Sequence, residues 1–304
     1  MSTQAMIESI KNDCALERIS RQIDCGAEVN GTGPGCATPL MRSTATHRND
    51  IVQLLLAHPN IRIDAKDADG QTALHWAVIN HNEGAVKMLL AEGADVNETD
   101  NKHKTALMLS VRHVDHDVAQ VLLTHCGILV DKRDTAGCTA LHRAVMNSDL
   151  KMIDLLIAHG ADVNARNYWQ MNTLHSACTI ANADGIVGAL VKAGVDVNAQ
   201  DRDGDTPLIR LSWSRTDTDA LMIGGLLIRE MSRVQAFCCL LMVLLFLHVS
   251  SQSMCGCALL IVWMIQQDAH NIVSLHRNAA HQRSEFVARV CATSSHIHVR
   301  ATVS

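Results

Sequence analysis

The sequence predicts an all-α solenoid, a stack of helix-turn-helix units, and three observations carry this prediction. Six leucines recur at steps of 33 or 34 residues, a period that belongs to a repeated unit and not to one helix or strand. Apolar residues around each leucine follow helical spacing. Only 3% of the 304 residues are aromatic while 48% are hydrophobic, which fits cores of Ala, Leu and Val between short helices. The leucines are Leu40, Leu74, Leu107, Leu141, Leu174 and Leu208.

The segment 67–97 contains one complete unit. It opens with Asp-Ala-Asp-Gly, a turn composition in which Gly70 suits a positive φ. Thr72 is placed to cap the first helix. Polar residues at 81–83 interrupt the apolar pattern, and a second helix then ends at Gly93. The unit is therefore predicted to consist of a turn, a helix, a second turn, a second helix and a loop, in this order.

This unit resembles an ankyrin repeat, whose signature Thr-Pro-Leu-His-x-Ala opens the first helix. The signature recurs around every leucine of the series, and Gly-Ala-x-Val-Asn closes several units in the same phase, as at 93–97. The resemblance implies an ankyrin-repeat solenoid of helix-turn-helix units with protruding turns, in which the leucines are structural. It also implies that His75, His142 and His175 bond to the turns of their own and adjacent repeats.

The repeat phase divides the chain into three parts. Residues 1–33 are expected to form a divergent N-terminal repeat that caps the stack. Residues 34–233 are expected to form the repeat array, and residues 234–304 are a hydrophobic and then degenerate tail. The count is about seven repeats, or nine if the tail continues the array.

The tail leaves three interpretations open. Residues 234–267 contain no Asp, Glu, Lys or Arg, but their two apolar runs are 12 residues each. A bilayer-spanning helix needs about 20 residues. The stretch is a membrane element, or a hydrophobic helix pair that continues the solenoid, or sequence that does not belong to the evolved fold.

Several classes of function are not expected. The net charge of −5 comes without the clustered Lys and Arg of a nucleic-acid interface. The chain lacks a phosphate-binding loop or a dinucleotide fingerprint, and no triad partner recurs beside the histidines. We therefore expect no enzyme, no catalytic residue, no cofactor, no metal site and no small-molecule substrate. Scattered cysteines and a polar N-terminus predict an intracellular, cytoplasmic protein, with membrane attachment through 234–267 as the alternative.

Asn97, Asn164 and Asn198 end the loops that follow second helices. In the family, this pattern resembles targets of an asparaginyl hydroxylase. Hydrogen bonding within the loop is the alternative, and it explains the asparagines without modification.

The expected function is protein–protein recognition by a scaffold or adaptor, because the resemblance implies binding along the turn tips and the exposed side of the first helices. The partner itself is not encoded in the architecture. The apolar cluster at 168–171 stands out, because Tyr and Trp dominate interface hot spots. By phase, Cys138 and Met146 are also expected to be exposed. The predicted partner-binding residues are Ala68, Asp69, Gln71, Asn80, Lys102, Lys104, Arg112, Tyr168, Trp169, Met171, Arg202 and Trp213.

Overall fold

The computed structural model describes residues 3–12, 14–181, 183–214 and 223–227, all within the compact unit Met1–Cys239. The tail at 234–304, with its three interpretations, lies outside the described residues. Among the helices that are described, none has the length and apolar character needed to cross a membrane.

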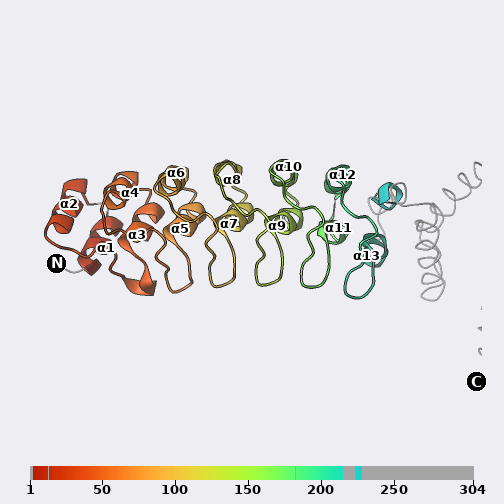
Figure 1. Cartoon of the computed structure of the whole chain (residues 1–304), viewed down its shortest axis with the longest axis horizontal. Coiled ribbons are helices and arrows are strands. Elements are labelled where there is room, and N and C mark those ends of the chain that lie inside the picture. The colour runs from red at the N-terminus through yellow and green to blue at the C-terminus, as the bar shows by residue number, and fades with distance from the viewer. Residues whose placement is uncertain (1–2, 13, 182, 215–222, 228–304) are drawn as a thin grey trace, which may run out of the picture. The chain divides into compact units, whose positions relative to one another are not determined.

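The described residues form two layers of short helices, stacked side by side in chain order (Figure 1). They contain no β-strand, only an isolated bridge between Thr99 and Thr105, so the all-α prediction is confirmed. A 3-10 turn at Pro34–Cys36 precedes the second unit. The first layer holds α1 (Thr3–Lys11), α3 (Pro39–Ala45), α5 (Ala73–Ile79), α7 (Ala106–Arg112), α9 (Ala140–Met146), α11 (Thr173–Ala177) and α13 (Pro207–Ser214). The second layer holds α2 (Leu16–Asp24), α4 (Asn49–Leu56), α6 (Glu83–Ala91), α8 (His116–Leu123), α10 (Leu150–Ala158) and α12 (Asp184–Lys192).

The predicted unit at 67–97 has the expected elements. Helix α5 starts directly after Thr72, and α6 follows the break at 81–82. Gly70 has φ +75° in the turn and Gly93 has φ +86° after the second helix. These are the left-handed conformations that glycine adopts without the steric cost of a Cβ atom.

From α3 to α11, a signature residue caps the start of each first helix. At α9, the Thr139 hydroxyl accepts the His142 backbone N–H at 3.4 Å, and His142 Nδ1 accepts the Thr139 N–H at 3.3 Å. At α11, Asn172 replaces Thr and makes the same reciprocal pair with His175. Two of the backbone donors that every helix start leaves unpaired are thus satisfied locally.

The core is one continuous cluster of aliphatic side chains, mainly Ala, Val, Leu, Ile and Met. All six leucines of the series are buried in it, and each first helix packs on the first helices of adjacent units and on its own second helix. In the pair α1–α2, Met6, Ile10 and Ile19 are buried while the charged residues at 8, 11, 17 and 18 are exposed. Contacts between neighbouring units therefore stabilise the stack.

Candidate functional site

From α5 to α13, the turn that precedes each first helix is organised by one side chain at its first position. Asp134 Oδ1 accepts the backbone N–H groups of Ala136 at 2.8 Å and of Cys138 at 3.0 Å. Asp67, Asp100, Asn167 and Asp201 make the same two bonds in their own turns. The five turns, here called the turn row, therefore share one shape. They are residues 67–71, 100–104, 134–138, 167–171 and 201–205.

Backbone hydrogen bonds join neighbouring tips of the turn row. The N–H of Asn101 donates to the carbonyl of Asp69 at 2.9 Å, and the N–H of Arg202 donates to that of Trp169 at 2.9 Å. The two intermediate tips are joined in the same way at 3.2 Å, Thr135 to Lys102 and Tyr168 to Ala136. The turns protrude on one side of the first layer (Figure 1), so the bonded tips present a fixed edge.

The second carboxylate oxygen of three turns is held by a side chain nine residues later. Asp67 Oδ2 accepts from Trp76 Nε1 at 2.8 Å, and Asp134 Oδ2 accepts from Arg143 Nε at 2.9 Å. Burial alone raises the pKa of the Asp134 carboxyl, but the bonds from Arg143 and two amides hold that pKa below its ordinary value. The turn is thereby tied to the helix that follows it.

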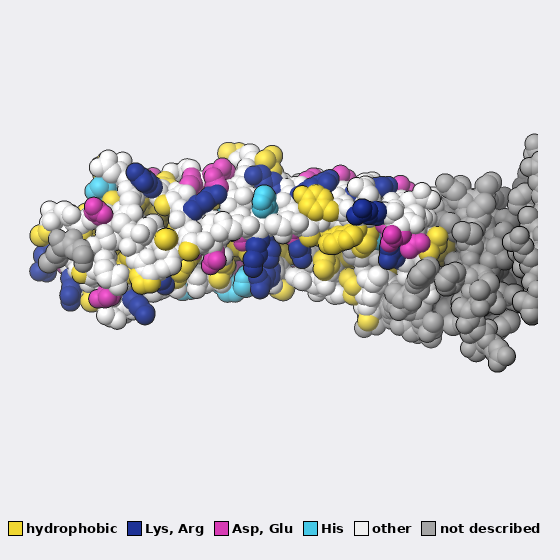
Figure 2. Space-filling view, turned by 90° about the horizontal axis from the view of Figure 1, so that it is seen from below, with side chains coloured by type: hydrophobic (Ala, Val, Ile, Leu, Met, Phe, Trp, Pro, Cys, Tyr) yellow, Lys and Arg dark blue, Asp and Glu magenta, His cyan; other side chains and the backbone are white. Residues whose placement is uncertain are grey.

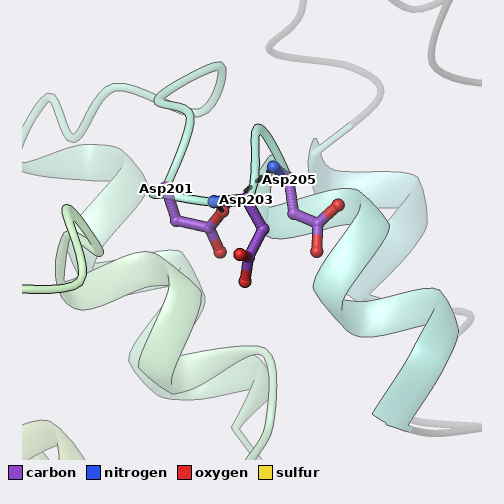
Figure 3. A group of neighbouring side chains, drawn as sticks. All are labelled: Asp201, Asp203 and Asp205. Carbon is purple, nitrogen blue, oxygen red and sulfur yellow. Dashed lines mark hydrogen bonds between the residues drawn. The ribbon is translucent and has the colours of Figure 1, made fainter.

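The third such turn carries a cluster of three carboxylates, Asp201, Asp203 and Asp205 (Figure 3). Their oxygens lie within 4.8 Å of one another, a spacing that a cation could bridge. Arg210 already occupies this place. Its guanidinium lies 2.7 Å from Asp201, 2.8 Å from Asp203 and 3.4 Å from Asp205. The cluster is therefore a structural ion network around one arginine.

The signature histidines link each unit to the next. His75 Nε2 lies 3.1 Å from the carbonyl of Lys104, and His142 and His175 bond equally to the carbonyls of Met171 and Asp205. Because Nδ1 accepts the amide of the helix cap, the proton of the neutral ring belongs on Nε2. Burial lowers the pKa of all three imidazoles. These contacts leave the rings inside the stack, away from any substrate.

Two of the loop asparagines bridge to the following loop. Asn97 Nδ2 donates to the Gly127 carbonyl and Asn97 Oδ1 accepts from the Leu129 N–H, both at 2.8 Å. Asn164 makes the equivalent pair with Gly194 and Asp196. These bonds match the structural alternative for the asparagines. Asn30, which the sequence did not single out, bonds in the same way to Asn60 and Arg62. The loop that would meet Asn198 lies outside the described residues.

The predicted partner-binding residues lie along the turn row and the adjacent side of the first helices. The side chain of Trp213 is not among those described. Cys138 is a correction: it is only 4% exposed, because Asn167 of the next turn lies against its thiol. Exposed residues are Ala68, Asp69, Lys102, Arg112, Tyr168, Trp169 and Arg202, and half-buried ones are Gln71, Asn80, Lys104 and Met171.

A basic hollow of about 310 Å³ lies between the first two tips of the turn row. Lys102, Lys104 and Arg112 line it, and none of the three forms an ion pair within the part of the chain that the structure describes. Burial, and then the charges of Arg112 and Arg143, hold the pKa of Lys104 below its ordinary value. Three cations thus line the hollow beside two carboxylates, Asp69 and Asp100, without forming an ion pair with either of them.

An apolar hollow of about 420 Å³ lies farther along, between the last three tips. Trp169 and Met146 line it and are both 53% exposed, with Met171 beside them. Figure 2 shows dark blue side chains near the middle of this face, yellow ones beside them toward the C-terminal end, and then a magenta group. Tyr168, 62% exposed, lies outside the hollow with its ring over Gly137.

Family profiles for ankyrin repeats match most of the described chain. The profile with three copies matches residues 6–100 and 93–167, and the profile with many copies matches residues 156–211. The nuclear factor NF-kappa-B p105 subunit of Gallus gallus is 32% identical over 169 residues, which are 53% of this chain and 17% of that protein. The B-cell lymphoma 3 protein homolog of Mus musculus is 33% identical over 189 residues, 60% of this chain and 41% of that protein. The chain thus spans less than half the length of these relatives.

Solved structures of ankyrin repeat domains also match this chain. The ankyrin repeat domain of Bcl-3, described as a unique member of the IkappaB protein family, matches with a TM-score of 0.65 at 28% identity, over 72% of this chain and 96% of that chain. An ankyrin repeat domain from Acinetobacter baumannii AYE matches with a TM-score of 0.57 at 30% identity, over 62% of this chain and 96% of that chain. With profiles that cover more than half of its length, this chain belongs to the ankyrin repeat family.

Proposed function

We propose that this chain is a protein-interaction scaffold or adaptor that binds a partner protein along the turn row and the adjacent side of the first helices. The observation that carries this proposal is the apolar hollow around Trp169, exposed on an edge whose backbone is fixed by hydrogen bonds. Exposed apolar clusters mark contact surfaces, and aromatic side chains dominate the energetics of interfaces.

The fixed edge favours binding for a second reason. Association costs free energy when loops must be ordered, and this cost falls when the binding residues are already held in place. The tips that carry Lys102, Trp169 and Arg202 are each bonded to a neighbouring tip. The partner-binding set predicted from the sequence, Trp213 included, remains our proposal for the contact residues.

We also infer a reducing compartment for the array. Three cysteines of the described residues, Cys25, Cys36 and Cys126, are free and exposed. Exposed free thiols are typical of intracellular proteins and are rare in secreted ones.

The test is a comparative capture from cell extract with the full-length protein, wild type and Trp169→Ala. We expect Trp169→Ala to lose about 2 kcal/mol or more of affinity for a captured partner, because it removes the aromatic wall of the hollow. The thermal midpoint is expected to stay nearly unchanged, since half of the ring is already in water.

Leu129→Ala is the matched control, because Leu129 is an equally exposed apolar residue, 56%, in a loop after α8 and away from the turn row. Partners that bind through the proposed surface are retained by Leu129→Ala and lost by Trp169→Ala. Equal capture by all three proteins, or a large loss of stability in Trp169→Ala with binding intact, contradicts the proposal.

A further inference from the structure

We propose that the turn row binds one extended acidic segment of a partner protein. Carboxylates of this segment lie over the basic hollow, and a large apolar side chain, about six or seven residues away along the segment, fills the apolar hollow. This inference rests on the proposed function and adds the chemistry of the partner.

The charge of the basic hollow selects an anionic group. Lys102 and Arg112 are exposed and Lys104 is half buried, and none of them has an ion-pair partner among the described residues. The hollow also contains two carboxylates. That of Asp100 already accepts two backbone N–H groups at 2.8 Å through one oxygen, and that of Asp69 is exposed.

Lys104 lies close to other cations. Burial lowers its pKa, and so do the charges of Arg112 and Arg143, while the carboxylate of Asp100 acts in the opposite direction. A carboxylate placed among Lys102, Lys104 and Arg112 therefore relieves repulsion between cations as well as pairing with them.

The apolar hollow accepts a different kind of group. Its floor and walls are Ala136, Met146, Trp169 and Met171, and the flexible thioethers adapt to side chains of varied shape. Two arginines at its rim, Arg143 and Arg210, already have internal acidic partners. The third, Arg202, makes no ion pair with a described residue, but the exposed carboxylate of Asp203 lines the same hollow, so the preference for acidic residues comes from the basic hollow.

The spacing between the two hollows gives the length of the segment. The basic hollow is centred between the first two tips and the apolar hollow near the fourth, so their centres are separated by about two and a half units. Adjacent helices of a stack lie about 8–10 Å apart, which gives roughly 20–25 Å. An extended chain advances about 3.3 Å per residue, so the two anchors are about six or seven residues apart.

The edge of the apolar hollow that is nearer the basic hollow leaves room for a passing chain. At the third position of the successive turns stand Asp69, Lys102, Ala136, Trp169 and Asp203. The smallest side chain, that of Ala136, lines this edge, where a bulky residue would raise a barrier. An extended backbone can therefore cross from one hollow to the other.

The experiment is a selection of random 16-residue peptides, displayed on phage, against the immobilised full-length protein. We expect enriched peptides to pair an acidic cluster with Trp, Phe, Leu or Met at a spacing of about six or seven residues. Fluorescence anisotropy with the best synthetic peptide then gives its affinity. We expect at least a fivefold loss in the double variant Lys102→Gln/Arg112→Gln, and at least a thirtyfold loss in Trp169→Ala.

Matched controls separate the surface from the rest of the molecule. Lys151→Gln removes an exposed cation from α10, and Leu129→Ala removes an exposed apolar group from a loop. Both are expected to bind the peptide as the wild type does. Raising the salt concentration is expected to weaken binding to the wild type more than to Lys102→Gln/Arg112→Gln, because the charge contacts are partly exposed to solvent.

Three outcomes of the peptide selection overturn the inference. They are enrichment of basic or uncharged peptides, a spacing near 14 residues that indicates a bound helix, and no enrichment at all. If any of these occurs while Trp169→Ala still loses a partner captured from extract, the acidic segment is rejected and the proposed function stands. If Trp169→Ala also leaves capture unchanged, both are rejected. A wild-type protein that self-associates through this face, with dissociation in Trp169→Ala, assigns the surface to a second copy and also rejects the segment.

Discussion

The contact between Gly137 and Tyr168 tests whether the tips of the turn row depend on one another. Gly137 has φ +74°, and a Cβ atom added there would lie 2.7 Å from the Tyr168 nitrogen and 2.8 Å from Tyr168 Cδ1. Gly137→Ala therefore combines a left-handed backbone cost of about 1–2 kcal/mol with an overpacking cost of about 1–3 kcal/mol. We expect a total loss of about 3 kcal/mol in the free energy of unfolding.

Gly160→Ala isolates the backbone cost. Gly160 has φ +82°, but nothing lies within 4 Å of the Cβ position, so we expect a loss of only about 1–2 kcal/mol. The difference between the two variants measures the close approach of two neighbouring tips. Because the Tyr168 N–H donates to the Ala136 carbonyl at 3.2 Å, the clash is also expected to weaken this bond.

Two measurements on the full-length protein check these expectations. Urea unfolding, followed by circular dichroism, gives the stability of each variant relative to the wild type. Hydrogen exchange of the Tyr168 amide is expected to accelerate in Gly137→Ala and to stay unchanged in Gly160→Ala. Equal destabilisation by the two substitutions, with equal exchange at Tyr168, refutes the reasoning that the tips are coupled by contact.

Three further predictions follow from the core, the histidines and the loops. Leu141→Ala is expected to lose about 2–5 kcal/mol of unfolding free energy in urea titrations, because Leu141 is fully buried in the core. The folded fraction is expected to keep its affinity for a partner. A loss below about 1 kcal/mol would contradict the structural role of this leucine. Because burial lowers the pKa of His75, His142 and His175 below 6.5, the unfolded chain binds more protons than the folded chain as the pH falls through this value. Unfolding free energies measured between pH 7.5 and about pH 5 are therefore expected to decrease on acidification, by at most about 1.4 kcal/mol per pH unit for each histidine, and a flat profile would reject the neutral buried imidazoles. Asn97→Ala breaks two hydrogen bonds to the next loop and is expected to lower the unfolding free energy by about 1–3 kcal/mol in the same titration. Asn101→Ala removes one exposed side-chain hydrogen bond and is expected to lower it by less. A larger loss in Asn101→Ala would contradict this expectation.

Most of the fold was predictable because its determinants are local and repeated. The step of the leucines, the threonine caps and the glycines at 70 and 93 each specify a conformation within one unit. Because each unit contacts only its neighbours, a structure that is predicted correctly for one unit also holds for the others. The tail interrupts this pattern, and its structure lies outside the described residues.

The site was predictable only in outline. The position of a residue within the repeat identified Trp169 and Lys102 as exposed. The same reasoning failed for Cys138, because position within one repeat does not show that Asn167 of the next turn covers the thiol. The two hollows are formed by side chains from several units, so their depth does not follow from any single repeat. One missed signal was present in the sequence: a donor stands nine residues after Asp67, Asp134 and Asp201, and each pair forms.

The contacts between successive units use the same chemical groups along much of the stack: an imidazole bonded to the next turn, a loop amide bonded to the next loop, and one backbone hydrogen bond between tips. A unit with these groups is interchangeable with its neighbours, so whole copies can be duplicated or deleted while the contacts between units are kept. The tip residues that make none of these contacts are free to vary in evolution, and a change of partner does not require a change of fold.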